Sequence, residues 1–138
     1  MASIFTRIIA GEIPGACVLQ TERWVAILDI NPVAPGHTLL IPRQEVALLP
    51  DLEGATLAES GAWLARIDRA LRSITDCDAV SILLRDGPAA GQEVPHLHWH
   101  LVPRFNGDHP HHFVGGSYAS DDQQEQMRSA IAAALDQQ

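Results

Sequence analysis

The sequence lacks any apolar run near the roughly 20 residues that a membrane-spanning helix needs, so no membrane association is expected. Its first residues also lack the basic segment and long apolar stretch of a secretory signal, and we therefore expect a cytoplasmic protein. Cysteine is scarce: Cys17 and Cys77 lie 60 positions apart. That spacing favours reduced thiols over a disulfide framework or a CxxC metal site.

Clustered positive charge is absent as well. The 138 residues carry a formal net charge of −8, and no block of Lys and Arg forms the basic stripe that a long phosphate backbone requires. This argues against nucleic acid as a partner, so any phosphate-bearing ligand must be small and held by local donors. No repeat or low-complexity linker divides the chain, and residues 1–138 are expected to form a single domain.

What is present is a series of short strands and helices. Ser3 can cap a first helix that Gly11 and Pro14 end. A central helix is predicted by apolar residues at helical spacing, namely Leu57, Leu64, Ile67, Leu71 and Ile74. Strands are expected at 17–20, 24–28, 38–41, 79–84 and 96–103, and a terminal helix at 123–135. The pattern predicts an α+β fold: an antiparallel sheet of about five strands with a central helix and short terminal helices.

Three alternating histidines dominate the last predicted strand. Side chains alternate between the faces of a strand, so His96, His98 and His100 share one face while Leu97, Trp99 and Leu101 share the other. The apolar face is expected to join the core, leaving three imidazoles exposed in a row. Core packing gives no reason for such a row, because each buried imidazole needs partners for both nitrogens. A functional role is therefore favoured over a purely structural one.

Two functions suit aligned imidazoles. They are common zinc ligands, but no HxxxH helix, CxxC pair or Asp-rich motif accompanies the strand. Alternatively, one ring acts as a nucleophile at phosphorus while its neighbours donate to phosphate oxygens and assist the leaving group. The preceding loop, Asp86–Gln92, favours phosphorus, because its glycines let backbone N–H groups approach an anion and Gln92 offers a side-chain amide.

The segment Gly91–Arg104, with its His-φ-His-φ-His-φ-φ pattern, resembles the signature of the histidine triad (HIT) proteins. Residues 3–14 resemble the start of the Hint branch of that family, and Pro35–Pro42 resembles its second motif block. The resemblance covers residues 3–104 and implies a HIT-like fold, with a loop and helix at 105–138 beyond it. It also implies a two-fold homodimer in which the two sheets are joined.

The resemblance implies a role for each matching residue. His98 would be the nucleophile that forms a nucleotidyl-histidine intermediate, and His100 would contact the scissile phosphate and assist the leaving group. His96 would support the site through its hydrogen bonds, and His37 would complete the cluster from a neighbouring strand. Asp29 would bind the ribose hydroxyls. The base pocket would be lined by Phe5, Ile8, Ile27 and Ile30.

The sequence departs from the Hint pattern at two positions. Glu93 stands where many Hint proteins carry a Ser that donates to phosphate, and Arg85 replaces a neutral amide and could supply positive charge near the substrate. The loop that contains Gly91 and Gln92 looks more like the Fhit branch, whose substrates are dinucleoside polyphosphates. The cysteine pair that holds a structural zinc in some bacterial relatives is absent, so no metal and no cofactor are expected. Three further histidines, His109, His111 and His112, are expected to lie exposed in a loop.

The predicted function is therefore hydrolysis or transfer at the α-phosphorus of a nucleoside phosphoramidate or related purine nucleotide, with an AMP or GMP moiety. Hydrolysis of dinucleoside polyphosphates, and nucleotide binding with little turnover, remain alternatives. Glu93 keeps the second alternative open, because a carboxylate repels phosphate unless it is protonated or turned outward.

Overall fold

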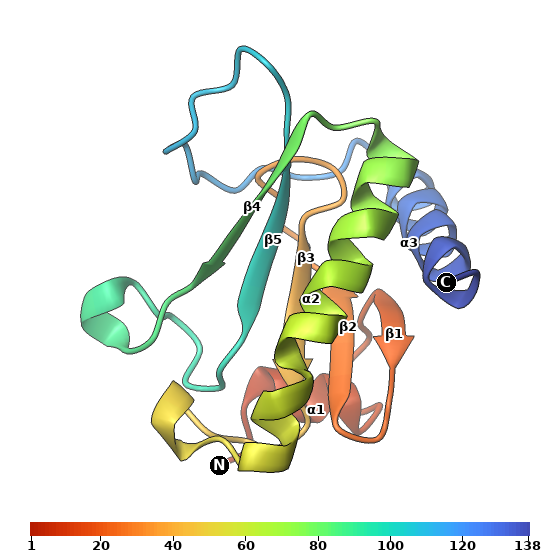
Figure 1. Ribbon diagram of the computed structural model, residues 1–138. Coiled ribbons are helices and arrows are strands. Elements are labelled where there is room, and N and C mark those ends of the chain that lie inside the picture. Colours follow the sequence, from red (N-terminus) through yellow and green to blue (C-terminus); the bar gives the residue numbers. More distant parts are fainter.

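A computed structural model describes residues 1–138. The protein contains one five-stranded sheet in the order β1-β2-β3-β5-β4, and all neighbouring strands run antiparallel (Figure 1). The predicted α+β class and five-stranded antiparallel sheet are confirmed. The strands are β1 (Cys17–Gln20), β2 (Trp24–Leu28), β3 (Thr38–Pro42), β4 (Ala79–Leu84) and β5 (Trp99–Arg104). The helices are α1 (Ile4–Ile9), α2 (Gly54–Thr75) and α3 (Asp121–Asp136), with short 3-10 turns at Leu49–Asp51 and Pro88–Ala90.

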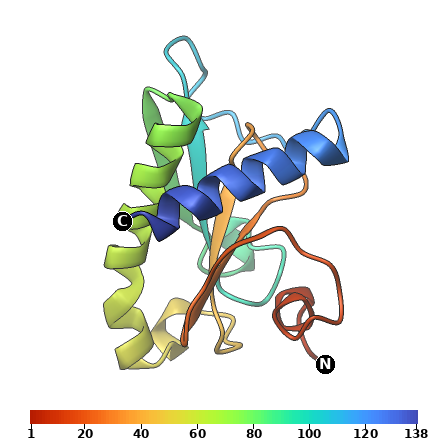
Figure 2. The same cartoon turned by 90° about the vertical axis from the view of Figure 1, so that its right-hand side faces the viewer.

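The sheet has an apolar layer on each face, and α1 and α2 lie on opposite sides of it (Figure 2). Under α2, the larger layer includes Leu40, Leu101 and two tryptophans, Trp24 and Trp99, whose rings meet edge to face at 5.5 Å. Trp24 also donates its indole N–H to the Thr56 carbonyl of α2 at 3.2 Å. The smaller layer, under α1, consists of Phe5, Val25, Ile27, Leu39 and Ile41. Period-2 alternation along β2 and β3 produces both layers, because successive side chains point to opposite faces.

The helix ends follow local chemistry. Ser3 accepts a hydrogen bond from the Thr6 N–H and so caps α1, as expected. Ser120 does the same for Gln123, so α3 begins at Asp121, two residues before its predicted start. No helix combines the length and apolar character required to cross a bilayer. Both cysteines are free.

The histidine strand begins later than predicted. β5 starts at Trp99, and His96 to His98 lie outside the sheet. The reason is that both neighbouring strands stop pairing at Trp99. Leu84, the last residue of β4, pairs with Trp99, and β3 pairs with nothing that precedes Trp99. Without a neighbouring strand, the preceding segment bonds elsewhere: the Leu97 N–H donates to the Val46 carbonyl at 2.8 Å.

Candidate active site

A cleft of about 290 Å³ opens on the α1 side of the sheet. Its apolar wall comes from α1, the segment after it and the end of β2, and its other wall from the loop between β4 and β5. All nine residues that the sequence predicted as nucleotide-binding line this cleft, namely Phe5, Ile8, Ile27, Asp29, Ile30, Arg85, Gly91, Gln92 and Glu93. His98 and His100 line it as well, whereas His96 and His37 stand behind them.

The histidines are buried rather than exposed, which corrects the sequence prediction. His37, His96, His98 and His100 retain between 0 and 9% of their surface. Alternation still separates the side chains correctly, since Leu97, Trp99 and Leu101 join the core under α2. Alternation along a strand predicts which face of the sheet a side chain lies on, but not which other segments pack over that face. Here α1 covers one end of the histidine row and the loop before α3 covers the other.

The main-chain carbonyl of His96 determines which ring nitrogen of His98 carries the hydrogen. Its Nδ1 lies 2.8 Å from the His96 carbonyl oxygen, which can only accept, so Nδ1 carries the hydrogen. In the neutral ring the lone pair is therefore on Nε2. Burial lowers the pKa of His98 below its ordinary value, which keeps the ring neutral at neutral pH. The edge of the Phe5 ring meets the His98 ring at 4.9 Å and restricts its rotation.

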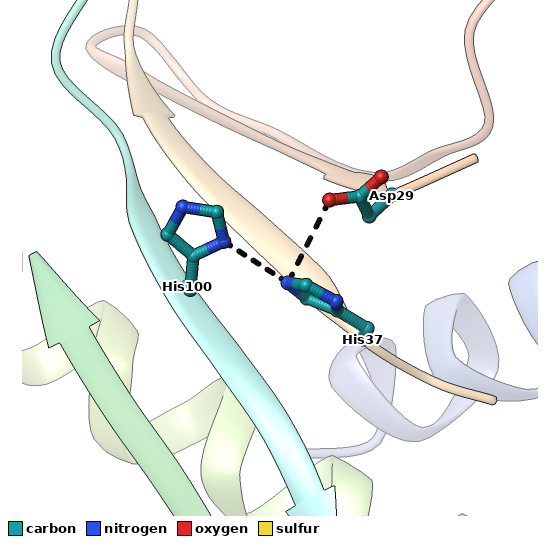
Figure 3. A group of neighbouring side chains, drawn as sticks. All are labelled: Asp29, His37 and His100. Carbon is teal, nitrogen blue, oxygen red and sulfur yellow. Dashed lines mark hydrogen bonds and ion pairs between the residues drawn. The ribbon is translucent and has the colours of Figure 1, made fainter. Parts of the chain in front are cut away.

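His37 and His100 form a directed pair (Figure 3). The Val33 N–H donates to His37 Nδ1 at 3.1 Å, so the His37 hydrogen is on Nε2. That Nε2–H donates to His100 Nδ1 at 3.0 Å, with Asp29 Oδ2 3.7 Å away. His100 consequently carries its own hydrogen on Nε2, as a donor for the cleft. Burial lowers the pKa of His37 to about 4 and that of His100 to about 3, so both rings stay neutral.

His96 is held by a polar network that sequence reasoning missed. Its Nε2–H donates to the Pro42 carbonyl at 2.7 Å, and its Nδ1 accepts from the Ser3 hydroxyl at 2.6 Å. Glu45 completes the network by accepting from the Ser3 N–H at 2.6 Å and the Thr6 hydroxyl at 2.7 Å. These bonds, chiefly the one from the Ser3 main chain, lower the pKa of Glu45 to about 2. The start of α1 is thereby fastened to the histidine segment.

The loop before the histidines closes on itself instead of forming the expected open anion cradle. The N–H groups of Gly87, Ala90, Gly91 and Gln92 all donate to acceptors within the loop. The Gln92 side chain is not a free donor either, because its amide accepts from the Gly87 N–H and donates to the Ala47 carbonyl at 2.8 Å. What the loop brings to the cleft is charge, in the side chains of Arg85 and the exposed Glu93.

Phe113, in the loop before α3, is a second residue that sequence reasoning missed. Its ring meets His37 at 5.6 Å and His100 at 5.1 Å, and the Arg85 guanidinium lies 4.4 Å from its centre. The loop is anchored nearby, since the Gly36 N–H donates to the Tyr118 hydroxyl. A single aromatic residue in a Gly- and His-rich stretch carries no signal of this role. His109, His111 and His112 of the same loop are exposed, as expected.

The cluster of Asp29, His37 and His100 brings ligand-type atoms within 4.8 Å of one another but fits a metal poorly. Because the Val33 N–H occupies His37 Nδ1, the neutral ring must keep its hydrogen on Nε2, the atom that faces Asp29 and His100. A metal ligand needs a lone pair there. The proton positions suit hydrogen bonding to a substrate better than metal coordination.

The fold and the histidine cluster together define a histidine triad protein. Residues 10–107 match the HIT domain family, and this chain belongs to that family. An uncharacterized HIT-like protein of Mycobacterium tuberculosis is 38% identical over 138 residues, which is 100% of this chain and 96% of the relative. The crystal structure of a zinc-bound histidine triad family protein from Mycobacterium smegmatis has 36% identity and a TM-score of 0.87, and the match covers 99% of this chain and 95% of that one.

Three other relatives are named for reactions on nucleotides. An adenosine 5'-monophosphoramidase of Saccharomyces cerevisiae is 37% identical over 75% of this chain and 63% of its own length. An adenylylsulfatase of Arabidopsis thaliana is 32% identical over 76% of this chain and 53% of its own length. A bis(5'-nucleosyl)-tetraphosphatase of Schizosaccharomyces pombe is 33% identical over 64% and 49%, respectively. HIT proteins related to this chain thus hydrolyse nucleotides with several different leaving groups.

Proposed function

We propose that this protein is a nucleotide hydrolase or transferase in which His98 attacks the α-phosphorus of a bound nucleotide. One observation carries the proposal: two rings that line the same cleft have opposite, fixed proton positions. His98 presents a bare Nε2 because its Nδ1–H is bonded to the His96 carbonyl. His100 presents an Nε2–H because its Nδ1 accepts from His37. A nucleophile beside a hydrogen-bond donor is what displacement at phosphorus requires.

The nucleotide binds with its base against the apolar wall and its ribose on Asp29. Phe5, Ile8, Ile27 and Ile30 give the purine of an AMP or GMP moiety an apolar surface. The Asp29 carboxylate keeps acceptor capacity for ribose hydroxyls beyond the bond that its Oδ1 accepts from the Asn31 N–H. This arrangement brings the α-phosphate to the two histidines.

The reaction has two displacements. In the first, the His98 Nε2 lone pair forms a nitrogen–phosphorus bond while the bond from phosphorus to the leaving group breaks and the leaving group takes the electron pair. The His100 Nε2–H donates to the developing negative charge. In the second, water attacks phosphorus, the nitrogen–phosphorus bond breaks, and its electron pair returns to His98. One proton of the water passes to solvent and the nucleoside monophosphate is released. His96 and His37 do not touch the substrate; they hold the orientation of His98 and His100.

Trapping the covalent intermediate tests this proposal. The protein is mixed with adenosine 5'-phosphoramidate or diadenosine triphosphate, quenched in base, and searched by mass spectrometry for an adenylated His98 peptide. We expect the adduct and released AMP with at least one substrate. Tight AMP binding with neither adduct nor turnover would instead favour a nucleotide-binding module, for which the carboxylate of Glu93 in the cleft is the motivating feature. Activity that EDTA abolishes would favour a metal-dependent hydrolase.

We also propose a cytoplasmic homodimer with the two sheets joined. β4 is an edge strand that pairs with β5 only, and it leaves Ile82 44% exposed. Unpaired edges are templates for pairing with another chain, so a second copy at β4 is the natural way to join two sheets. The two free cysteines suit a reducing compartment. Sedimentation of the wild type against an Ile82→Lys variant tests the dimer, and a wild-type monomer would disprove it.

A further inference from the structure

Arg85 differs from every other arginine of the protein. The chain has nine basic residues, all arginine, and eight of them form an ion pair with a carboxylate or donate to a carbonyl or another polar side chain. Those eight are Arg7, Arg23, Arg43, Arg66, Arg69, Arg72, Arg104 and Arg128. Arg85 has neither an ion pair nor a hydrogen bond, although it is half-buried in a cleft that two carboxylates, Asp29 and Glu93, also line. Its guanidinium keeps all five N–H donors free.

The Arg85 side chain is nevertheless held in position. The Phe113 ring supports its guanidinium at 4.4 Å, in cation–π geometry. The Arg85 side chain also packs against Gly91, where a Cβ atom would come 3.2 Å from Arg85 Cδ. Gly91 has φ +95°, a left-handed conformation that glycine adopts without strain. The Arg85 guanidinium is thus held in position while its N–H donors remain unused. This is the arrangement expected of a residue that binds an anionic group of a ligand.

The location of Arg85 identifies which part of the substrate it meets. Two aromatic rings flank the histidine row: Phe5 contacts His96 and His98 at one end, and Phe113 contacts His100 and His37 at the other. Phe5 belongs to the proposed base wall. Arg85 lies with Phe113, next to the donor His100, at the end away from that wall. A phosphate chain that extends from the α-phosphorus away from the base wall therefore runs toward Arg85.

An amine and a phosphate chain need different assistance to leave phosphorus. An amine leaves phosphorus readily only when it is protonated. An amine therefore depends on a proton donor such as the His100 Nε2–H, and Arg85, which does not give up a proton, offers it no help. A phosphate chain departs as an anion and needs only its charge stabilised, which a guanidinium fork does well.

We infer that Arg85, supported by Phe113, is the specificity-determining residue for the leaving group and selects nucleotides whose α-phosphate is joined to further phosphate. This inference rests on the proposed function and narrows it. Diadenosine triphosphate, which releases ADP, belongs to the favoured class, and adenosine 5'-phosphoramidate, which releases ammonia, does not. Phe113 lies beyond residues 10–107, the part of the chain that matches the HIT domain family.

The test compares the two substrates in matched variants. They share the adenosine, the α-phosphate and the nucleophile, and differ in the leaving group alone. For Arg85→Gln we expect kcat/KM to fall about 10- to 100-fold with diadenosine triphosphate and less than about threefold with the phosphoramidate, because one charge-assisted contact is lost with the first substrate only. Arg85→Lys should lie between, since it keeps the charge without the fork. Arg7→Gln removes one positive charge from α1, outside the cleft, and should change neither value.

Three outcomes distinguish the possibilities. An equal loss with both substrates would mean that Arg85 binds the α-phosphate itself, and an unchanged triphosphate rate would mean that it binds nothing; either overturns the inference and leaves the proposed function standing. A wild type that cleaves neither substrate and forms no His98 adduct overturns both. If Arg85→Gln is poorly folded by circular dichroism, Phe113→Leu replaces it. That variant loosens the support of Arg85 without touching its charge, and it also removes the ring that contacts His37 and His100. Both rates should therefore fall, and the triphosphate rate should fall severalfold more than the phosphoramidate rate.

Discussion

The two ends of the histidine row are built differently. At the α1 end, His96 and His98 give their hydrogens to main-chain carbonyls, and the Ser3, Thr6 and Glu45 network fills the remaining positions. At the other end a relay runs from the Val33 N–H through His37 to His100, and it finishes with an unused Nε2–H beside the unpaired Arg85. At the α1 end the ring hydrogens of His96 and His98 are all bonded within the protein, which fixes the lone pair on His98 Nε2; we call this the saturated end. The other end, the relay end, keeps unused N–H donors on His100 and Arg85. The first therefore suits attack and the second suits departure.

Removing the attacking ring should have the largest effect. For His98→Ala we expect turnover of every substrate to fall by at least about 10³-fold, because no other bare ring nitrogen lines the cleft. AMP binding should change little, since the base wall and Asp29 are untouched. Steady-state rates and AMP titration by calorimetry measure the two effects. Comparable turnover in the variant would move the chemistry to the other end of the row.

Acid should destabilise the relay end. His37 and His100 have a pKa of about 4 and about 3 in the folded protein and an ordinary value near 6.5 when unfolded. Well above pH 6.5 both states are neutral at these rings, and stability is then independent of their titration. As pH falls from 6.5 toward 4, the unfolded chain takes up protons that the folded protein does not, so stability decreases by up to about 1.4 kcal/mol per pH unit for each ring.

Urea unfolding at pH 7.5, 6.5 and 5.5 measures this loss, to which His96 and His98 add in the same direction because burial also lowers the pKa of each. A triple variant of the exposed histidines (His109→Gln, His111→Gln and His112→Gln) is the matched control and should show the same decrease, because those rings are in solvent in both states. Stability that rises on acidification would mean that the buried rings gain protons in the fold.

The sequence predicts correctly on which face of the strand each side chain of the site lies, but it does not predict how deeply the histidines are buried. Alternation places Leu97, Trp99 and Leu101 in one core and the histidines opposite, and both features hold. Exposure was predicted wrongly because it depends on what packs over a face. The start of β5 was wrong because strand length depends on a partner, and β4 stops at Leu84.

The same limit explains the loop and the residues that were missed. Local composition shows glycines that can free N–H groups, but the Gln92 amide folds back and the loop uses those groups itself. Glu45 and Phe113 reach the histidines only through tertiary contacts, and neither residue stands in a motif. Sequence motifs name the residues that react; the residues that orient them come from elsewhere in the chain.

A substitution of Glu45 tests whether the hydrogen-bond network at the α1 end positions His98 for attack. Glu45→Ala removes the acceptor of the Ser3 N–H and the Thr6 hydroxyl, so Ser3 no longer holds His96 firmly. The His96 carbonyl, which orients His98, is then less well positioned, and the His98 Nε2 lone pair is no longer directed at the substrate. We expect kcat to fall on the order of tenfold with little change in KM. Glu45→Gln, which keeps a carbonyl acceptor, should recover part of the loss, and Glu53→Ala, an exposed carboxylate without a side-chain partner at its helix end, should change nothing.

Nitrogen NMR of the rings separates positioning from general stability. In the wild type His98 should be protonated at Nδ1, and in Glu45→Ala the ring should populate both tautomers. A variant that loses activity while the His98 tautomer stays fixed would show that the network acts only by stabilising α1.

The smallest effect is expected at Asp29, which lies beside His37 at the relay end. Its carboxylate is 3.7 Å from His37 Nε2 and lines the cleft beside the proposed ribose position. Asp29→Asn keeps the shape and removes the charge, so the preference for AMP over 2'-deoxy-AMP should weaken by about three- to tenfold in Kd, the size of one hydroxyl bond. Asp29→Ala should weaken the preference similarly, and kcat should change little because Val33 and His100 still hold His37. A ribose preference that survives both substitutions would mean that Asp29 serves the relay alone, and that the sugar is bound by another part of the cleft.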